Sequence, residues 1–226
     1  VMLGKLVIEG SPEPAEFVDP NKENLAALVS TKQVETYGNG KYRIVLVDCG
    51  CKYNIVRCLT KRNATVIRVP WDYDFTQIDY DGVMLSNGPG DPQQCGATIA
   101  NIRKAIALGK PIFGICLGNQ LLSIAAGATT FKLKYGHRSH NQPALMVGTD
   151  RAVITSQNHG FAVDTTTLDE GWEPYFVNLN DGTSEGIRHR TKPFFSVQFH
   201  PEASGGPVDT EFLFDDFIQN IEKCRK

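Results

Sequence analysis

Residues 42–48 form a nearly unbroken run of β-branched and other apolar side chains, and this run constrains the fold more than any other stretch. A strand of this composition is typical of a parallel sheet that is covered by helices on both faces. Residues 51–62 then place apolar side chains at helical spacing, and residues 64–69 and 82–86 are predicted to be two further strands. This alternation with short links predicts an α/β fold, with a mixed, largely parallel central sheet flanked by helices.

The alternation continues through the middle of the chain and changes in its second half. A helix is predicted around Ile99, then a strand at 111–115 and a helix at 117–126. After about residue 128 the pattern favours additional β segments, and a last amphipathic helix carries Phe217. The predicted β segments lie at 131–135, 152–155, 184–188 and 194–199.

Length, charge and cysteine content narrow the class of protein. The chain has 226 residues, of which 41% are hydrophobic, and a formal net charge of -2. This is enough chain for one domain with its own core, and the scattered basic residues favour neither a nucleic-acid nor a membrane partner. Six cysteines are too few for a disulfide framework and indicate a reducing, cytoplasmic setting. Residues 1–40, interrupted by prolines, are predicted to be a connector before a main domain at 41–226.

Cys116 lies between Gly114 and Gly118, where the predicted strand gives way to a helix. This is the pattern of a nucleophile on a sharp strand-to-helix turn, in which small neighbours leave room for strained backbone. The helix N-terminus favours a thiolate, and the N–H group of Leu117 points to where an oxyanion would form. A buried structural cysteine between two packing glycines is the alternative interpretation.

His200 and Glu202 supply the chemistry that a cysteine nucleophile needs. His200 follows the last predicted strand, and Pro201 prevents that strand from continuing. Because the carboxyl ends of parallel strands meet at one edge of a sheet, we expect His200 near Cys116. His200 can then act as the base and Glu202 can orient it. A histidine that ends a strand beside a solvated glutamate is the alternative.

Two polar stretches, 135–141 and 156–161, are predicted to be turns. The first carries His137 and His140, which either contact a partner or belong to a solvated loop. The second carries His159, and its composition is suited to holding a small polar ligand.

Taken together, these residues resemble the class I, triad-type glutamine amidotransferase domain, and more narrowly the glutaminase part of carbamoyl-phosphate synthetase. The resemblance extends over nearly the whole chain, and the wording around His200 is similar to that of the fused eukaryotic pyrimidine-pathway polypeptide. The matching stretches are 48–54, 85–92, 114–121, 135–143, 156–162 and 198–202.

The resemblance implies a role for each matching residue. Cys116 attacks the glutamine carboxamide, His200 handles the protons, Glu202 orients His200, and the amides of Gly88 and Leu117 form the oxyanion hole. The residues implied to bind the substrate are Ser86, Gly88, Gly90, Leu117, Gln120, Asn158, Gly160 and Phe161.

The implied reaction converts glutamine to glutamate and ammonia through a Cys116 thioester. Ammonia then travels to a carbamoyl-phosphate synthetase domain or large subunit, which makes carbamoyl phosphate from bicarbonate and ATP. No metal or cofactor is expected in this chain, and ATP and Mg²⁺ are expected only in the synthetase. Residues 1–40 would be the tail of an N-terminal small-subunit domain.

Two positions depart from the family pattern. Asn119 stands where glutamine-dependent members commonly have His. An Asn at this position resembles the sequence of the ammonia-dependent branch, although that branch lacks the catalytic cysteine. Ser139 stands where Gly is frequent. The alternative function is therefore a catalytically weak or inactive module that regulates or scaffolds a synthetase. A cysteine hydrolase or amidotransferase of another pathway is a third possibility, against which the Asn-His-Gly-Phe stretch at 158–161 argues.

Overall fold

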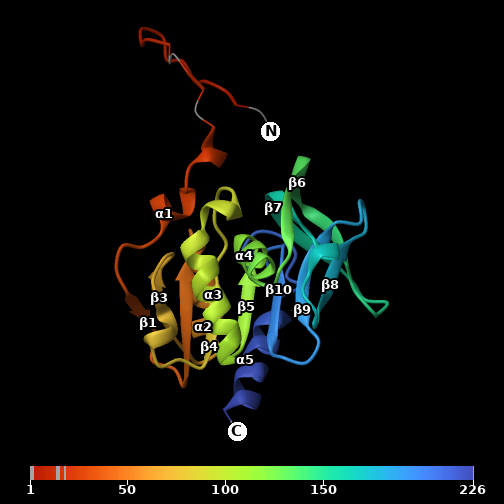
Figure 1. Cartoon of the computed structure of the whole chain (residues 1–226). Helices are drawn as coiled ribbons and strands as arrows, with labels where there is room; N and C mark the ends of the chain where they lie inside the picture. The colour runs from red at the N-terminus through yellow and green to blue at the C-terminus, as the bar shows by residue number, and fades with distance from the viewer. Residues whose placement is uncertain (1–2, 14–15, 18, 226) are drawn as a thin grey trace.

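The computed structural model (Figure 1) describes residues 3–13, 16–17 and 19–225. Its strands are β1 (Glu35–Tyr37), β2 (Tyr42–Asp48), β3 (Ala64–Pro70), β4 (Gly82–Leu85), β5 (Ile112–Ile115), β6 (Thr129–Met146), β7 (Ala152–Asp164), β8 (Trp172–Asn178), β9 (Ser184–His189) and β10 (Phe194–Val197). Its α-helices are α1 (Leu25–Val29), α2 (Tyr53–Thr60), α3 (Gly96–Leu108), α4 (Leu117–Ala125) and α5 (Phe212–Cys224).

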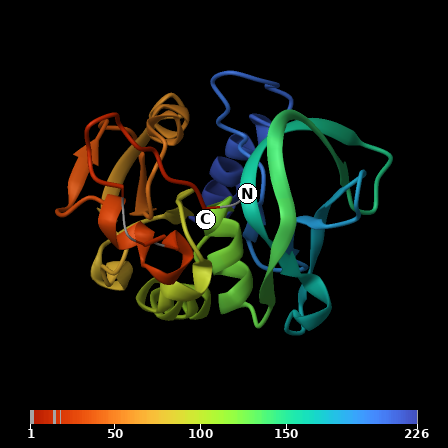
Figure 2. The same cartoon turned by 90° about the horizontal axis from the view of Figure 1, so that it is seen from above.

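Within the described residues the strands form one sheet, in the order β1-β3-β2-β4-β5-β10-β9-β8-β6-β7. The pairs that join β3, β2, β4, β5 and β10 are parallel, whereas β1 and the strands from β9 to β7 pair antiparallel. Viewed from above, the antiparallel strands form a curved unit beside the parallel half (Figure 2). The predicted mixed α/β fold is confirmed, and the additional β segments make up the antiparallel half.

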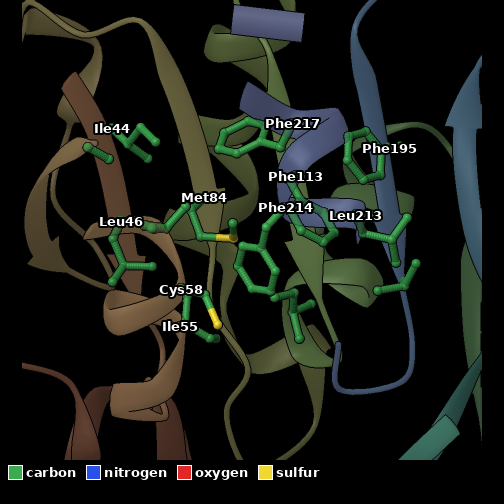
Figure 3. Packing of buried hydrophobic residues seen from close by; sticks show 14 of the residues in the cluster. Ile44, Leu46, Ile55, Cys58, Met84, Phe113, Phe195, Leu213, Phe214 and Phe217 are labelled. Carbon is green, nitrogen blue, oxygen red and sulfur yellow. The ribbon is translucent and has the colours of Figure 1, made fainter. Parts of the chain in front are cut away.

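Two apolar layers cover the parallel half, because successive residues of a strand face opposite sides. Ile44 and Leu46 face α2 and α5, whereas Val45 and Val47 face α3 and α4. On the α5 side an aromatic group fills the core, and the rings of Phe113 and Phe195 stack with centroids 4.5 Å apart (Figure 3). Hence the central strands are buried on both faces, as their unbroken apolar sequence predicts.

The antiparallel half differs from the sequence expectation in two places. The stretches 135–141 and 156–161 are not turns but parts of the long strands β6 and β7, whose register shifts twice where β6 is irregular. Strand β8 was not predicted, and its pairing with β9 is also interrupted, between Pro174 and Phe176. These strands contain polar residues and pair irregularly, so their sequences do not show the alternation of apolar and polar residues from which a strand is predicted.

The chain before α1 extends from the body as an arm (red in Figure 1). Its Leu3 and Asp19 reach the same surface hollow as Cys116. The predicted connector thus contains α1 and β1 as well as irregular chain. Within the part of the chain that the structure describes, no helix is long and apolar enough to cross a membrane.

Candidate active site

Cys116 occupies the turn between β5 and α4 in a strained backbone conformation. Its φ is 54° and its ψ is -103°, a region that costs a residue with a side chain about 1–3 kcal/mol. A Cβ atom on Gly114 would lie 2.6 Å from the carbonyl oxygen of Gly118, and one on Gly118 would lie 2.3 Å from that of Leu85. Both glycines are therefore needed for α4 to start this close to the sheet.

His200 reaches the same sheet edge because β10 pairs in parallel with β5. Val197 lies opposite Ile115, and the N–H group of Cys116 donates to the Val197 carbonyl at 2.9 Å. Three residues further, the N–H group of His200 donates to the Ser156 carbonyl of β7 at 2.9 Å. The end of β10 is thus fixed between the nucleophile turn and the antiparallel half.

Glu202 orients the imidazole of His200. Its Oε1 atom lies 2.7 Å from Nδ1 of His200, and its side chain is fully buried. Lys52 places its Nζ atom 3.7 Å from the same oxygen, and Asn54 donates to the Glu202 carbonyl. Since Nδ1 is engaged by the carboxylate, Nε2 remains for the cysteine sulfur.

The electrostatics of this group favour a cationic His200. Burial alone lowers the pKa of His200, but the charge and hydrogen bond of Cys116, followed by those of Glu202, raise the pKa to about 10. A protonated imidazole beside the sulfur favours the anionic, nucleophilic form of a cysteine. Cys116, His200 and Glu202 therefore lie in a connected series, in the arrangement that a nucleophile, a base and an orienting carboxylate would need.

A cavity of about 380 Å³ opens above Cys116. This volume is in the range of small-molecule sites. The predicted residues that line it are Gly88, Gly90, Cys116, Leu117, Gln120, Asn158, Gly160 and Phe161. A larger hollow of about 490 Å³ opens beside Phe194, at the start of β10 and thus at the far end of that strand from His200.

Two backbone amides are suited to hold an oxyanion at this cavity. The N–H group of Leu117 is the first of α4, so it has no acceptor within the helix. Gly88 packs so closely that a Cβ atom would lie 2.1 Å from the Cys49 carbonyl oxygen, which brings its backbone to the cavity wall. The geometry is compatible with the predicted oxyanion hole.

Ser86 is not where the resemblance suggests. It is fully buried and does not line the cavity. Its hydroxyl accepts from the N–H group of Cys49 at 2.9 Å and donates to the Asn87 carbonyl at 2.8 Å. Ser86 therefore braces the ends of β2 and β4 against each other behind the cavity wall, and the expected contact with substrate is corrected to this supporting role.

Asn119 also lies behind the cavity, not in it. It is fully buried, its amide donates to Oε1 of Gln198 at 3.1 Å, and its oxygen accepts from the Ser196 hydroxyl at 2.8 Å. Gln120 donates to the same Gln198 oxygen at 3.0 Å and to the Phe161 carbonyl at 3.1 Å. Asn119 thus belongs to the support of the cavity wall, with no contact to the cavity itself.

Ser139 is accommodated in β6 without strain. The positive φ angles of non-glycine residues in the described chain belong to Asn63 and Cys116 alone. The Ser139 hydroxyl accepts from the Gln142 side chain at 2.8 Å, next to a register shift of the strand. A glycine is therefore not required at this position.

Sequence reasoning missed several residues of the cavity wall. Lys132 and Arg138 of β6 line it, and Asp19 contributes from the arm, whereas His159 of β7, which also lines it, belongs to the stretch whose composition suits a small polar ligand. Arg138 lies in the polar stretch 135–141, whose composition predicts a turn and not a strand that lines a cavity. For Asp19 no signal exists, because the path of an irregular arm is not encoded in a periodic pattern.

Comparisons with known proteins agree with this geometry. The family model described as "Glutamine amidotransferase class-I" matches residues 45–220. The chain is 52% identical over 98% of its length to "Carbamoyl-phosphate synthase [ammonia], mitochondrial" of Homo sapiens. It is 53% identical over 96% of its length to "Multifunctional protein CAD" of Squalus acanthias. It is 51% identical over 98% of its length to "Carbamoyl phosphate synthase arginine-specific small chain" of Saccharomyces cerevisiae.

The chain spans only part of these relatives: 15% of the human protein, 10% of the dogfish protein and 56% of the yeast small chain. Among solved structures, a glutamine amidotransferase of Thermotoga maritima shares the fold with a TM-score of 0.60 and 16% identity, and the match covers 83% of this chain and 86% of that one. The match of the family model over most of the chain, together with this fold, shows that the chain belongs to the class-I glutamine amidotransferase family.

Proposed function

We propose that this chain is the glutaminase component of a carbamoyl-phosphate synthase, which hydrolyses glutamine and supplies ammonia to a synthetase. The observation that carries the proposal is that Cys116 lines a cavity together with most of the predicted substrate residues, while the imidazole of His200 lies beside Cys116 and is held by Glu202. An amide is a poor electrophile with a poor leaving group. It needs a soft nucleophile, an oxyanion site and an acid for the departing nitrogen, and this site offers all three.

In the first step, the Cys116 sulfur attacks the carboxamide carbon of glutamine. The carbonyl oxygen gains negative charge and accepts hydrogen bonds from the amides of Leu117 and Gly88. His200 donates its proton to the amide nitrogen as the carbon–nitrogen bond breaks. Ammonia leaves, and a glutamyl thioester remains on Cys116.

In the second step, water replaces ammonia. Neutral His200 takes a proton from the water as its oxygen adds to the thioester carbonyl, and the carbon–sulfur bond breaks. The new carboxyl group releases its remaining proton to the solvent, glutamate leaves, and the Cys116 thiolate is restored beside a protonated His200. Glu202 keeps the imidazole in one orientation through both steps, because its own position is fixed by burial and by its 2.7 Å contact with Nδ1.

Glutamine itself would be held by the walls of the cavity. Gly90, Asn158 and Gly160 offer backbone and amide groups at the cavity, and the Phe161 backbone completes the wall. The Gln120 amide is fixed from behind through its bonds to Phe161 and Gln198, so it can present one orientation to the substrate.

The proposed partner is a carbamoyl-phosphate synthetase domain or large subunit. Relatives of the chain are named as carbamoyl-phosphate synthases, as a small chain and as a multifunctional protein, which supports this assignment. Ammonia would pass through a tunnel to the synthetase, where ATP and Mg²⁺ act. We place the activity in the cytoplasm, in pyrimidine or arginine biosynthesis, and take residues 1–40 as the tail of a small-subunit domain.

Glutamate release from glutamine tests the proposal, with the chain alone and with a carbamoyl-phosphate synthetase partner. We expect release that accelerates with the partner and falls by about a thousandfold or more in Cys116→Ala, because the nucleophile is lost. Cys224→Ala is the matched control, since Cys224 is exposed at the far end of α5.

Failure of the folded wild-type chain to release glutamate in either condition would contradict a glutaminase. It would instead favour a non-catalytic module that scaffolds the synthetase.

A further inference from the structure

A second cluster of ionisable side chains lies in the antiparallel half, outside the Cys116 site. It consists of His137 of β6, His159 of β7 and Glu185 of β9, whose ligand atoms lie within 4.8 Å of one another. Glu185 is fully buried and His159 is nearly so. Among the residues that the structure describes, no other group of three His, Cys, Asp or Glu side chains comes close enough to share a metal ion.

The fold brings these three residues together from separate strands. His137 lies directly opposite His159 in the β6–β7 pairing, and their rings meet edge to face with centroids 4.8 Å apart. Strand β9, which β8 separates from β6 in the sheet order, places Glu185 Oε1 3.3 Å from Nδ1 of His137.

Hydrogen bonds on the outer side of each ring fix which nitrogen carries hydrogen. Nε2 of His137 lies 2.9 Å from the Asp181 carboxylate, and Nδ1 of His159 lies 2.8 Å from the Phe161 carbonyl. Because both partners can only accept, each outer nitrogen is a donor. When both rings are neutral, the inner nitrogens, Nδ1 of His137 and Nε2 of His159, have their lone pairs available on the side of Gln157.

Gln157 adds an oxygen to this centre. Its Oε1 atom lies 2.9 Å from Nδ1 of His137 and 3.1 Å from Nε2 of His159. The amide cannot be turned around, because its nitrogen donates to the Thr155 hydroxyl at 3.0 Å, and that hydroxyl donates to the Gln142 carbonyl at 2.7 Å. An oxygen therefore faces two imidazole nitrogens.

Glu185 adds a buried carboxylate to the two imidazoles. Its Oε1 atom accepts from the Asn178 amide at 2.8 Å, whereas its buried Oε2 atom has no hydrogen-bond partner in the described structure. A buried carboxylate oxygen without a partner is costly. Two imidazole nitrogens, an amide oxygen and a carboxylate that converge in this way offer a set of donor atoms suited to a cation.

We propose that His137, His159 and Glu185 bind a divalent transition metal, for which Zn²⁺ is the best fit, with Gln157 Oε1 as the fourth ligand. Two imidazoles and oxygen donors suit this ion, and the carboxylate and carbonyl behind the two rings hold them as they are held in protein metal sites. Tetrahedral Zn²⁺ with bonds of about 2.0–2.1 Å places its ligand atoms about 3.4 Å apart. On binding, the contacts of Gln157 Oε1 with the two rings, 2.9 Å and 3.1 Å, would lengthen slightly, and the widest spacing in the cluster, within 4.8 Å, would shorten.

The site lies near the surface and has a structural consequence. A surface hollow of about 380 Å³ is lined by His137 and Asp181, so the cluster lies next to the surface on the outer side of the His137 ring. The bound metal joins β6, β7 and β9, and it fixes His159, which also lines the cavity above Cys116. The metal therefore stabilises one wall of that cavity and takes no part in the reaction at Cys116. This assignment departs from the expectation of no metal in the chain.

The alternative to a metal ion is a second hydrogen on His137, which would let Nδ1 donate to Gln157 and Glu185. Hydrogen bonding to Glu185, opposed by burial and supported by Asp181, raises the pKa of His137 to about 9. In that case the cluster is a buried ion pair only.

Zn²⁺ binding to the full chain, freed of metal by a chelator, separates the two alternatives. Titration calorimetry should show one equivalent bound by the wild type, with affinity at least a hundredfold lower in His137→Asn and in Glu185→Gln. Asp181→Asn should lower the affinity about ten- to a hundredfold, because this carboxylate holds the His137 ring. His140→Asn is the matched control and should bind as the wild type does, since His140 lies on the same strand but contacts Ser156.

No binding by the folded wild type, or binding that survives in both His137→Asn and Glu185→Gln, would overturn the proposal. Co²⁺ provides a measurement that needs no variant. The wild type should give the visible absorption of a tetrahedral site without a thiolate charge-transfer band. Such a band would assign the metal to Cys116 or another cysteine and would also overturn the proposal.

Discussion

His200 carries its positive charge at a pH where a free imidazole has lost it. Its pKa is raised to about 10 by Cys116 and then by Glu202, against the effect of burial. A histidine with a raised pKa contributes stability that is complete below its unfolded value of about 6.5 and is lost as pH rises through the folded value. The stabilisation by protonated His200 should therefore persist at neutral pH and disappear towards about pH 10.

Glu202→Gln tests this account at the level of one residue. Loss of the carboxylate should lower the pKa of His200, which the pH titration of its ring protons by NMR would show. The difference in free energy of unfolding between wild type and variant should shrink as pH rises from 7 towards 10. Glu211→Gln is the matched control, since Glu211 pairs with Lys61 and Arg62 on the surface. An unchanged His200 pKa in Glu202→Gln would contradict the role given to the carboxylate.

At the scale of elements, the close contact of α4 with β4 holds the nucleophile turn. Gly118→Ala would place a methyl group 2.3 Å from the Leu85 carbonyl oxygen, so the helix must move away from the sheet. We expect a loss of about 1–3 kcal/mol in the free energy of unfolding, as for other overpacked sites, and slower alkylation of Cys116 by iodoacetamide.

Gly96→Ala is the control for this change, because a Cβ atom there has no neighbour within 4 Å at the start of α3. This variant should be as stable as the wild type or slightly more so. Denaturant titration and the alkylation rate measure both effects. A Gly118→Ala chain with wild-type stability would show that the contact is not limiting.

The elements that the sequence predicts well are those buried on both faces. Strands β2 and β5 are short apolar runs that no other environment favours, and the parallel pairing of β5 with β10 follows from them. The same reasoning does not predict the full length of strands β6 and β7, because many of their side chains are polar and line a cavity or belong to the His137 cluster. In β7 the buried positions still alternate with less buried ones, but Thr155, Gln157 and His159 occupy three of them, so the sequence lacks the apolar–polar alternation of a strand and resembles a turn.

The residues of the candidate site also fall into those that could be placed from the sequence and those that could not. Cys116, His200 and Glu202 could be predicted because each follows a strand that was itself predictable, and the strand ends share one edge of the sheet. Ser86 and Asn119 could not be placed, since both are polar residues beside the site whose side chains turn towards buried partners. Which side of the wall a polar side chain occupies depends on packing that no local pattern records.

At the scale of the molecule, α5 joins the end of the chain to the core beneath the site. Phe113 of β5 packs against Phe214 and Phe217 of α5, with ring centroids 5.6 Å and 5.8 Å apart (Figure 3). The same apolar cluster extends to Cys116. Residues 41–226 are therefore expected to unfold as one unit, in which damage to α5 is transmitted to the nucleophile turn.

Phe217→Ala should remove about 3–5 kcal/mol from the free energy of unfolding, because it leaves a cavity among rings that are fully buried. Denaturant titration followed by circular dichroism and by the reactivity of Cys116 should give one coincident, shifted transition. Gln219→Ala, on the exposed side of the same helix, should change stability by less than about 0.5 kcal/mol. Two separate transitions, with Cys116 protected through the first, would instead divide α5 from the unit that holds the site.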